Sequence, residues 1–413
     1  MGEKYATAGP NGLAAVRSRI APVLNKIREG ALSRENNREL PFDAVESLRA
    51  AGFGSVRIPA AFGGDGVSFG DLVELLIDVA QADSNVAQVF RGHIGFTEHV
   101  LTLPEGTDRD FWLNEITSGA IVGNAHSERG SSAVTAPQAT VTEIGGEYRL
   151  SGRKYYSTGS IFADWIYTNA YLDGDYVTAL VRAQAPGVER IDDWDGFGQK
   201  MTGSGTTVFD NTPIESEHLH RVTGNVLPVT ALNAIYQIVH LATLSGIAAA
   251  AREEAIDYVN QRQRGAIGAL VEVPREDPQV QQVVGEVATV AYAAAATTRA
   301  AAAAIERVQD LESRCIATDG DFARTDTEVF LAQGAVIDLT LRAATDLFKV
   351  GGSSATSRSR ALDRHWRNAR TIASHNAEVV RTRTIGQFLL GGSAPAALSY
   401  TTDESEGATH DVE

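Results

Sequence analysis

The chain has 413 residues, 43% hydrophobic and 21% charged, which is ordinary for a globular protein with two or three packed units. Its formal net charge of −16 argues against binding to nucleic acid or anionic membranes, and we find no continuous apolar run of the roughly 18 residues that a membrane helix needs. The single cysteine, Cys315, excludes an internal disulfide, and Met1–Gly12 lacks a signal-peptide pattern, so we expect a cytoplasmic protein.

Residues 1–119 predict an N-terminal α-helical domain. Apolar residues recur at helical spacing from Leu13 to Ile27, and a second helix opens at Pro41. A third helix is expected from Asp71, and a fourth over Asn85–Leu103.

The apolar period changes to two in residues 120–225, which predicts a central, β-barrel-like domain. Gly145-Gly146 separates two alternating runs and indicates a tight hairpin. A second hairpin is expected around Asp173-Gly174-Asp175, and a short strand at Val208–Asp210.

Residues 226–392 predict a C-terminal four-helix bundle, and residues 393–413 an irregular tail. Alanine favours helix and permits close helix packing, and it is abundant in this region. The expected helices cover 231–263, 277–310, 328–350 and 359–390.

This order of an α-helical, a β and a second α-helical part gives an α+β fold class and resembles the acyl-CoA dehydrogenase fold. Local motifs carry the resemblance as well. Residues 124–132 are similar to the family's A-x-T-E-P-x-A-G-S-D segment beside the flavin, and residues 150–159 to L-x-G-x-K-x-W-I-T-N. Tyr258 with Arg262 and Arg264, and the segment 348–352, resemble two segments that reach a flavin phosphate.

The segment 367–376 resembles the place where acyl-CoA dehydrogenases carry their catalytic glutamate. Here Asn376 takes the place of the glutamate, and His375 that of the preceding tyrosine. An amide cannot take a proton from a substrate carbon, so the likeness is closer to reduced-flavin oxygenases related to dibenzothiophene monooxygenase. Two differences from that group are Ile372, where the group has a second histidine, and Thr158, where it has serine.

The resemblance implies a two-component flavin monooxygenase that uses reduced FMN and O2, through a flavin hydroperoxide, to oxygenate a small organosulfur, amine or aromatic substrate. FAD is the alternative flavin. Small hydroxyl, amide and imidazole groups suit this chemistry, because they can hydrogen-bond to a peroxide without acting as strong bases. The expected catalytic residues are His93, Asn124, Thr158 and His375. The expected cofactor-binding residues are Asn124, Ser127, Thr158, Trp194, Arg262, Arg264, Gly351, Gly352 and Ser353.

Each residue also has a structural interpretation. His93 and Trp194 are residue types that often serve packing alone, and Gly351-Gly352 could simply end a helix. Arg262 and Arg264 could be solvated surface charges. His218-Leu219-His220 has metal-like spacing but no evident carboxylate or cysteine cluster beside it, so no metal is expected.

The Gly-rich segments 203–205 and 63–66 do not fit a dinucleotide fingerprint. Reduced flavin is therefore expected from a separate NAD(P)H-dependent flavin reductase. The fold also implies a homotetramer, in which the phosphate-binding segments complete a site in a neighbouring subunit. Two alternatives remain open: an acyl-CoA dehydrogenase with a relocated base, and a non-catalytic helical interaction protein.

Overall fold

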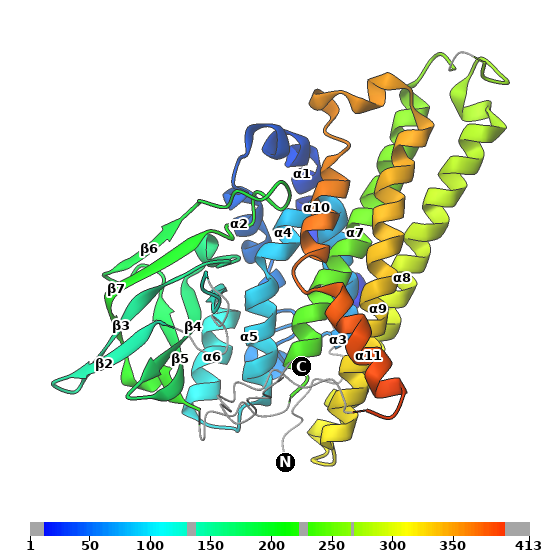
Figure 1. Cartoon of the computed structure of the whole chain (residues 1–413). Helices are drawn as coiled ribbons and strands as arrows, with labels where there is room; N and C mark the ends of the chain where they lie inside the picture. The colour runs from blue at the N-terminus through cyan, green and yellow to red at the C-terminus, as the bar shows by residue number, and fades with distance from the viewer. Residues whose placement is uncertain (1–11, 130–137, 223–229, 266–267, 393–413) are drawn as a thin grey trace, which may run out of the picture.

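The computed structural model describes residues 12–129, 138–222, 230–265 and 268–392. A β-sheet lies to one side of a helical body that both ends of the chain build together (Figure 1). The order of an α-helical, a β and a second α-helical part that the sequence predicts is present in the described residues. The boundary expected at residue 225 and the tail from 393 lie outside the described residues.

Six helices form the N-terminal part. One stripe of α1, including Val16 and Ile20, is buried at helical spacing, as the apolar pattern predicts. The Ser68 hydroxyl accepts a hydrogen bond from the backbone N–H of Asp71 at 3.0 Å and caps α3. The helices are α1 (Leu13–Asn37), α2 (Phe42–Ala50), α3 (Phe69–Ala82), α4 (Ser84–Val89), α5 (Arg91–Thr102) and α6 (Thr107–Thr117).

The single helix expected over Asn85–Leu103 is wrong, because the chain breaks at Phe90. There the backbone N–H of Phe90 bonds to the carbonyl of Ala87, which tightens the last turn of α4. The ring of Phe90 packs edge-on against Phe53, with centroids 5.0 Å apart. A new helix therefore begins at Arg91.

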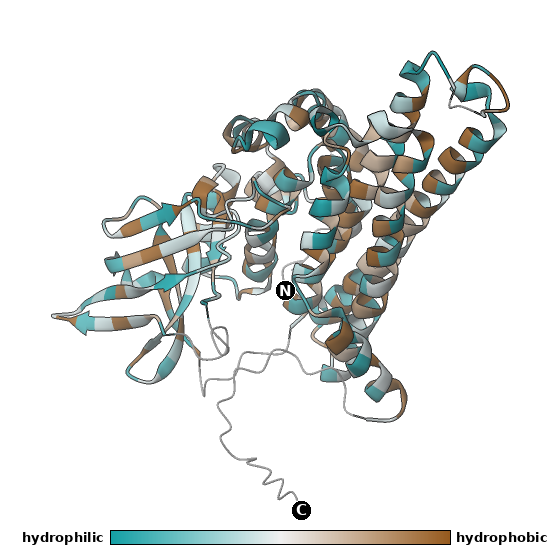
Figure 2. Cartoon of the chain, turned by 45° about the horizontal axis from the view of Figure 1, so that its top comes forward, coloured by the Kyte–Doolittle hydropathy of each residue, from teal (hydrophilic) through white to brown (hydrophobic). Residues whose placement is uncertain are grey.

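Eight strands form one sheet in the order β6-β7-β3-β2-β4-β5-β8, and β1 pairs in parallel with β4. Both expected hairpins are present, and Gly145, Gly146 and Gly174 adopt the positive φ angles that their turns require. Figure 2 shows polar and apolar residues interspersed along these strands. The strands are β1 (Val122–Ala125), β2 (Thr140–Ile144), β3 (Glu147–Lys154), β4 (Trp165–Leu172), β5 (Asp175–Arg182), β6 (Val188–Ile191), β7 (Thr206–Ile214) and β8 (Leu219–Arg221).

Three long helices and two shorter ones form the C-terminal part. Asp277 caps α8, and Thr318 with Asp321 forms a capping box that starts α9 earlier than expected. The single helix expected over 359–390 is wrong, because it is interrupted between α10 and α11. The helices are α7 (Leu232–Gln261), α8 (Pro278–Ser313), α9 (Asp319–Asp346), α10 (Arg364–Ala373) and α11 (Glu378–Leu389).

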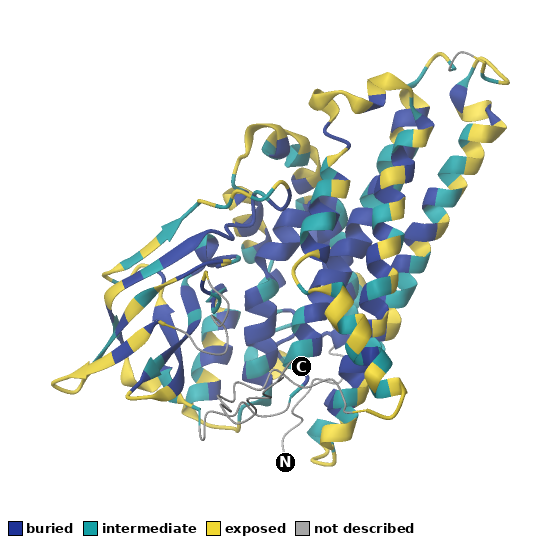
Figure 3. Ribbon diagram, in the orientation of Figure 1, coloured by how far each residue is buried: buried dark blue, intermediate teal, exposed yellow. Residues whose placement is uncertain are grey.

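The N-terminal helices and the bundle share one hydrophobic core, whereas the sheet has a core of its own. A third apolar cluster, which includes Trp112 and Trp165, joins α5 and α6 to the sheet. Helix α7 is long and apolar enough to pass a test for a membrane span, but 83% of the apolar window is buried inside the protein. Figure 3 shows this helix dark blue over most of its length, and we interpret it as the core helix of the bundle.

Candidate active site

The break between α10 and α11 places His375 and Asn376 against α7. The Asn376 side-chain N–H donates to Gln237 Oε1 at 2.6 Å, and the Gln333 amide lies 3.4 Å from the carbonyl oxygen of Asn376. The rings of His375 and His240 lie 4.4 Å apart. The position where the related dehydrogenases carry a base therefore holds an amide that is already bonded to a neighbouring helix.

The opposite wall is built where α5 begins and β1 ends. A Cβ on Gly92 would lie 2.7 Å from Asn124 Oδ1, so glycine at position 92 allows α5 and β1 to approach. Arg91 Nε donates to the carbonyl of Tyr236 on α7 at 3.2 Å, and its guanidinium lies 4.9 Å from the centroid of the Tyr236 ring. We refer to the group of neighbouring side chains Arg91, Asn124, His126, His240 and His375 as the recess.

Three imidazoles in the recess are kept neutral. Burial, reinforced by the positive charges of Lys154 and Arg91, lowers the pKa of His126 to about 3. Desolvation of the ring and the charge of Arg91 lower the pKa of His375 to about 3, although the residue as a whole is exposed. Burial, Arg91 and His375 likewise lower the pKa of His240 well below its usual value. Arg91 therefore supplies the positive charge among three uncharged rings at neutral pH.

Two polar atoms of the recess have no hydrogen-bond partner among the described residues. They are the Asn124 Oδ1 acceptor and His240 Nε2. The Gln88 amide nitrogen lies 3.0 Å from His240 Nδ1, and with the amide in this orientation the ring hydrogen is on Nε2. Buried polar groups are nearly always paired, so an orphaned acceptor and an orphaned donor fit a polar ligand such as the edge of a flavin.

Thr158 begins a hydrogen-bond chain with a fixed direction. The Thr202 hydroxyl donates to the carbonyl of Gln199 at 2.9 Å, so it must accept from Ser204, 2.7 Å away. Ser204 in turn accepts from Thr158 at 2.7 Å. The Thr158 hydroxyl hydrogen is therefore committed to Ser204, which leaves its oxygen free to act as an acceptor. A Cβ on Gly159 would lie 2.4 Å from the carbonyl oxygen of Val89, so this turn lies against the end of α4.

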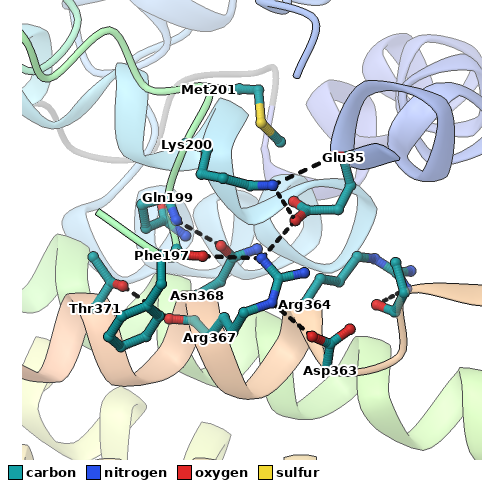
Figure 4. A network of polar contacts seen from close by, with 12 residues as sticks. Glu35, Phe197, Gln199, Lys200, Met201, Asp363, Arg364, Arg367, Asn368 and Thr371 are labelled. Carbon is teal, nitrogen blue, oxygen red and sulfur yellow. Dashed lines mark hydrogen bonds and ion pairs between the residues drawn. The ribbon is translucent and has the colours of Figure 1, made fainter. Parts of the chain in front are cut away.

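A polar network holds the Gln199 end of that chain to the rest of the protein (Figure 4). Glu35 on α1 is almost fully buried, with Lys200 Nζ at 3.0 Å and Arg367 Nη1 at 2.7 Å from its Oε1. The Asn368 side-chain oxygen accepts from the backbone N–H of Gln199 at 2.6 Å. The network thus ties together α1, the segment after β6 and α10, and it fixes the carbonyl on which the hydroxyl chain ends.

His93 has a different place from the one expected. Its Nε2 lies 2.8 Å from the carbonyl of Gly54, and its Nδ1 accepts from the backbone N–H of Val122 at 3.2 Å. Burial also lowers its pKa, so the ring is neutral and both nitrogens are used by the backbone. We therefore leave His93 out of the catalytic set and assign it to joining α5 with β1.

Two expected cofactor residues lie on the sheet side of the molecule. Trp194 Nε1 donates to the carbonyl of Gly198 at 3.0 Å, and its ring lies 5.9 Å from that of Tyr156. Ser127 follows β1, and its carbonyl accepts from the backbone N–H of Tyr155 at 2.8 Å. Both side chains are partly exposed, which leaves them available to a ligand.

The phosphate-binding candidates gather at the far end of α7. Arg262 Nη1 donates to the carbonyl of Val350 at 2.8 Å, and a Cβ on Gly351 would lie 2.8 Å from the ring of Tyr258. Tyr258 is 18 residues beyond His240 on the same helix, which corresponds to about 27 Å. One chain therefore does not bring this group to the recess. The group also includes the exposed residues Arg264, Gly352 and Ser353.

His218 has two carboxylates beside it, which corrects the expectation from the sequence that it has none. Ligand atoms of Glu215, Glu217 and His218 lie within 4.8 Å of one another, and His220 is not part of that group. His218 is buried among aromatic rings, 4.9 Å from Trp165, while both glutamates are exposed. Exposed acidic groups of this kind are common without a metal, and we build nothing on them.

Sequence reasoning missed Arg91 and His240, and gave His126, Tyr236 and Ser204 no role. Arg91 stands directly before Gly92-His93. Because one unbroken helix was predicted there, the sequence did not show that Arg91 is the first residue of α5. His240 lies within a long apolar stretch of α7, where a lone histidine is usually structural.

Comparison with known proteins relates the chain to flavin-dependent enzymes. The sequence profile of the acyl-CoA dehydrogenase C-terminal domain matches residues 238–379, which include α7 and the break at His375. The chain is 27% identical to the probable FMNH2-dependent monooxygenase SfnC of Pseudomonas putida, over 90% of this chain and 93% of that protein. It is 26% identical to dibenzothiophene monooxygenase of Rhodococcus erythropolis, over 85% of this chain and 87% of that protein.

Solved structures show the same architecture. FMN-bound TdsC from Paenibacillus sp. A11-2 superposes with a TM-score of 0.84 at 25% identity, over 92% of this chain and 98% of that one. Methanesulfinate monooxygenase MsuC from Pseudomonas fluorescens superposes with a TM-score of 0.83, over 93% and 99% of the two chains. At 24% identity the second match supports the fold alone.

Proposed function

Since this chain is a flavin-dependent monooxygenase of the acyl-CoA dehydrogenase fold, we propose that it binds reduced FMN in the recess and oxygenates a small organic substrate there. The observation that carries the proposal is the recess itself. It combines an amide at position 376 in place of a base with neutral imidazoles and orphaned hydrogen-bonding atoms. The candidate substrates are organosulfur compounds, amines and aromatics.

The flavin supplies the activation of O2, and the protein supplies orientation, hydrogen bonds and shelter from water. Asn124 offers an orphaned acceptor to one edge of the ligand. Thr158 offers an oxygen whose hydrogen is turned away, which suits a donor such as the N5–H of a reduced flavin. Ser127 and Trp194 are partly exposed on the sheet side and are proposed to line the same ligand.

His375 is the proposed proton carrier. Its ring is neutral, and it lies 4.4 Å from the ring of His240, whose Nε2 has no partner among the described residues. A neutral imidazole can donate a hydrogen bond without abstracting a carbon-bound proton, and it can pass a proton when oxygen is transferred. His93 takes no part, because both of its ring nitrogens are bonded to the backbone.

The phosphate group of FMN needs a cation, and we propose that Arg262 and Arg264 of a neighbouring subunit provide it. The distance of about 27 Å along α7 between this group and the recess supports an arrangement in which subunits share each site. Gly351, Gly352 and Ser353 belong to the same proposed phosphate site. We therefore propose a homotetramer, located in the cytoplasm where NAD(P)H can drive a separate flavin reductase.

Light scattering tests the assembly. We expect a particle of four 44.0 kDa chains, and weaker FMN binding by the double variant Arg262→Gln/Arg264→Gln with the tetramer preserved. A stable, fully active monomer would show that the sites do not depend on a neighbouring subunit.

The alternative of an acyl-CoA dehydrogenase with a relocated base needs a carboxylate in the recess. Among the contacts that the structure describes for Arg91, His240 and His375, none is to an aspartate or a glutamate. This supports oxygenation rather than dehydrogenation. The similarity to a probable FMNH2-dependent monooxygenase and to an FMN-bound structure also argues against the alternative of a non-catalytic helical interaction protein.

The test is a product screen. Purified protein, a flavin reductase, FMN and NADH are incubated with thioethers, sulfones, amines and phenols, and products are analysed by mass spectrometry. We expect the mass of one added oxygen in one of these classes, with little hydrogen peroxide. Dye reduction with acyl-CoA and no oxygen insertion would favour the dehydrogenase instead.

A further inference from the structure

Arg91 is a cation for which the described structure provides no counter-ion. One contact is between its Nε and a backbone carbonyl, and another is between its guanidinium and the face of Tyr236. None of the ion pairs in the described part of the chain includes Arg91, and its two terminal nitrogens have no hydrogen-bond partner there. A guanidinium removed from bulk water is normally paired, because leaving it alone is costly.

The groups around Arg91 add donors rather than negative charge. His240 presents an orphaned Nε2, and burial and Arg91 itself keep His240, His126 and His375 uncharged. Burial lowers the pKa of Arg91 only to about 10, so the guanidinium keeps its charge at neutral pH. The recess is thus a locally positive, donor-rich site in a chain whose net charge is −16.

We propose that Arg91 is a receptor for an anionic group of the substrate, so that the enzyme takes small organic acids with a two-oxygen head such as a carboxylate or a sulfinate. The two terminal nitrogens of a guanidinium form a planar fork that matches such a head in two parallel hydrogen bonds. His240, whose pKa the charge of Arg91 lowers, has an unpaired Nε2 that could supply a third donor. This inference rests on the proposed function, because it assigns the substrate of the same recess.

Arg91 is anchored to the helical bundle. Asn124 belongs to β1, whereas the nitrogen Nε of Arg91 donates to the carbonyl of Tyr236 on α7. Glycine at position 95 makes room for Tyr236, since a Cβ there would lie 2.1 Å from its ring. The guanidinium is therefore held against α7 by its own Nε and by the ring of Tyr236.

The test is a calorimetric titration of the protein, with and without oxidised FMN, by matched acids and amides. Acetate, benzoate and benzenesulfinate are the anionic probes, and acetamide and benzamide are the neutral ones. We expect the anions to bind at least about tenfold more tightly than the amides, and this preference to disappear in Arg91→Gln. Arg91→Lys keeps the charge without the fork and should retain part of the preference.

Arg381→Gln is the matched control. Arg381 is an arginine on α11 whose charge acts on both Asp326 and His375, so its electrostatic field reaches the recess. It should leave the acid preference unchanged, which would exclude a general field effect. Thermal unfolding checks that each variant is folded.

Three results would overturn the proposal. They are no binding of any anion to the wild-type protein, an unchanged preference in folded Arg91→Gln, and loss of reduced-FMN affinity in Arg91→Gln with normal acid binding. The last result would assign Arg91 to the flavin. If instead the protein binds acids but no flavin, the proposed function fails while the anion site stands.

Discussion

The hydroxyl of Thr158 donates to that of Ser204 across 2.7 Å, and this single contact decides what Thr158 can offer to a ligand. Because the chain ends on the carbonyl of Gln199, the hydroxyl hydrogens of Thr158, Ser204 and Thr202 all point along the chain toward that carbonyl. Ser204→Ala should release the Thr158 hydroxyl to rotate and to donate to oxidised flavin. We expect the reduction potential of bound FMN to fall by about 10 to 30 mV, the equivalent of one neutral hydrogen bond.

Thr202→Val breaks the same chain one step further on and should shift the potential in the same direction. Ser216→Ala, on an exposed turn, serves as the control. Equal potentials in the wild-type and Ser204→Ala proteins would show that the direction of the chain has no effect on the flavin.

Replacing His375 tests the proposed proton carrier. His375→Ala should bind FMN nearly as well as the wild-type protein but release hydrogen peroxide in place of product. Loss of a general acid–base contribution is worth about 10²–10⁴-fold in rate. Oxygen uptake and product are measured together, with His220→Ala on β8 as the control. Full coupling in His375→Ala would assign His375 to structure alone.

Replacing His93 should cost stability rather than chemistry. His93→Ala would leave the carbonyl of Gly54 and the N–H of Val122 unpaired, at a cost of about 2 to 4 kcal/mol in the free energy of unfolding. Denaturant unfolding measures this loss. The ratio of product to hydrogen peroxide should stay unchanged in the folded variant. A His93→Ala protein that is as stable as the wild type but releases hydrogen peroxide in place of product would show that His93 takes part in the reaction.

Asp326 predicts a dependence of stability on pH. Burial raises its pKa from 3.8 to about 6, against the opposing hydrogen bond from Asn233. The folded protein therefore binds this proton more tightly than the unfolded chain, and the stabilisation present below about pH 4 is lost as the pH rises to 6. Asp326→Asn should be more stable than the wild-type protein at pH 8, by on the order of 2 kcal/mol.

Unfolding at pH 4 and at pH 8 measures the difference, which should vanish at the lower pH. Asp338→Asn, exposed on the same helix, is the control and should show no such change. A destabilised Asp326→Asn protein at pH 8 would mean that the ionised carboxylate is needed where it is.

Features of the fold that depend on a few neighbouring residues were predicted correctly from the sequence. The hairpin of β2 and β3 followed from Gly145-Gly146, because two glycines accept the positive φ angles of the turn. The break after α10 was not predicted, since Ser374–Ala377 contains neither glycine nor proline. That break is held by tertiary contacts, above all the bond between Asn376 and Gln237.

The recess shows the same limit. Asn124, Thr158 and His375 were found because they stand in motifs that resemble those of a known family. Arg91 and His240 stand in no such motif. Their importance comes from side-chain nitrogens that have no partner among the described residues, which only the folded chain reveals. The role expected of His93 changed for the opposite reason, because the fold gives it two backbone partners.

The burial of α7 has a consequence for how the protein is made. This apolar helix packs against α3, which is synthesised before it, and against α8 and α9, which are synthesised after it. Its surface cannot be fully covered until Asp346 has left the ribosome, 85 residues after Gln261 (346 minus 261). At roughly 5–20 residues per second this takes about 4 to 17 s, during which a membrane-like helix stands open to chaperones and to other nascent chains.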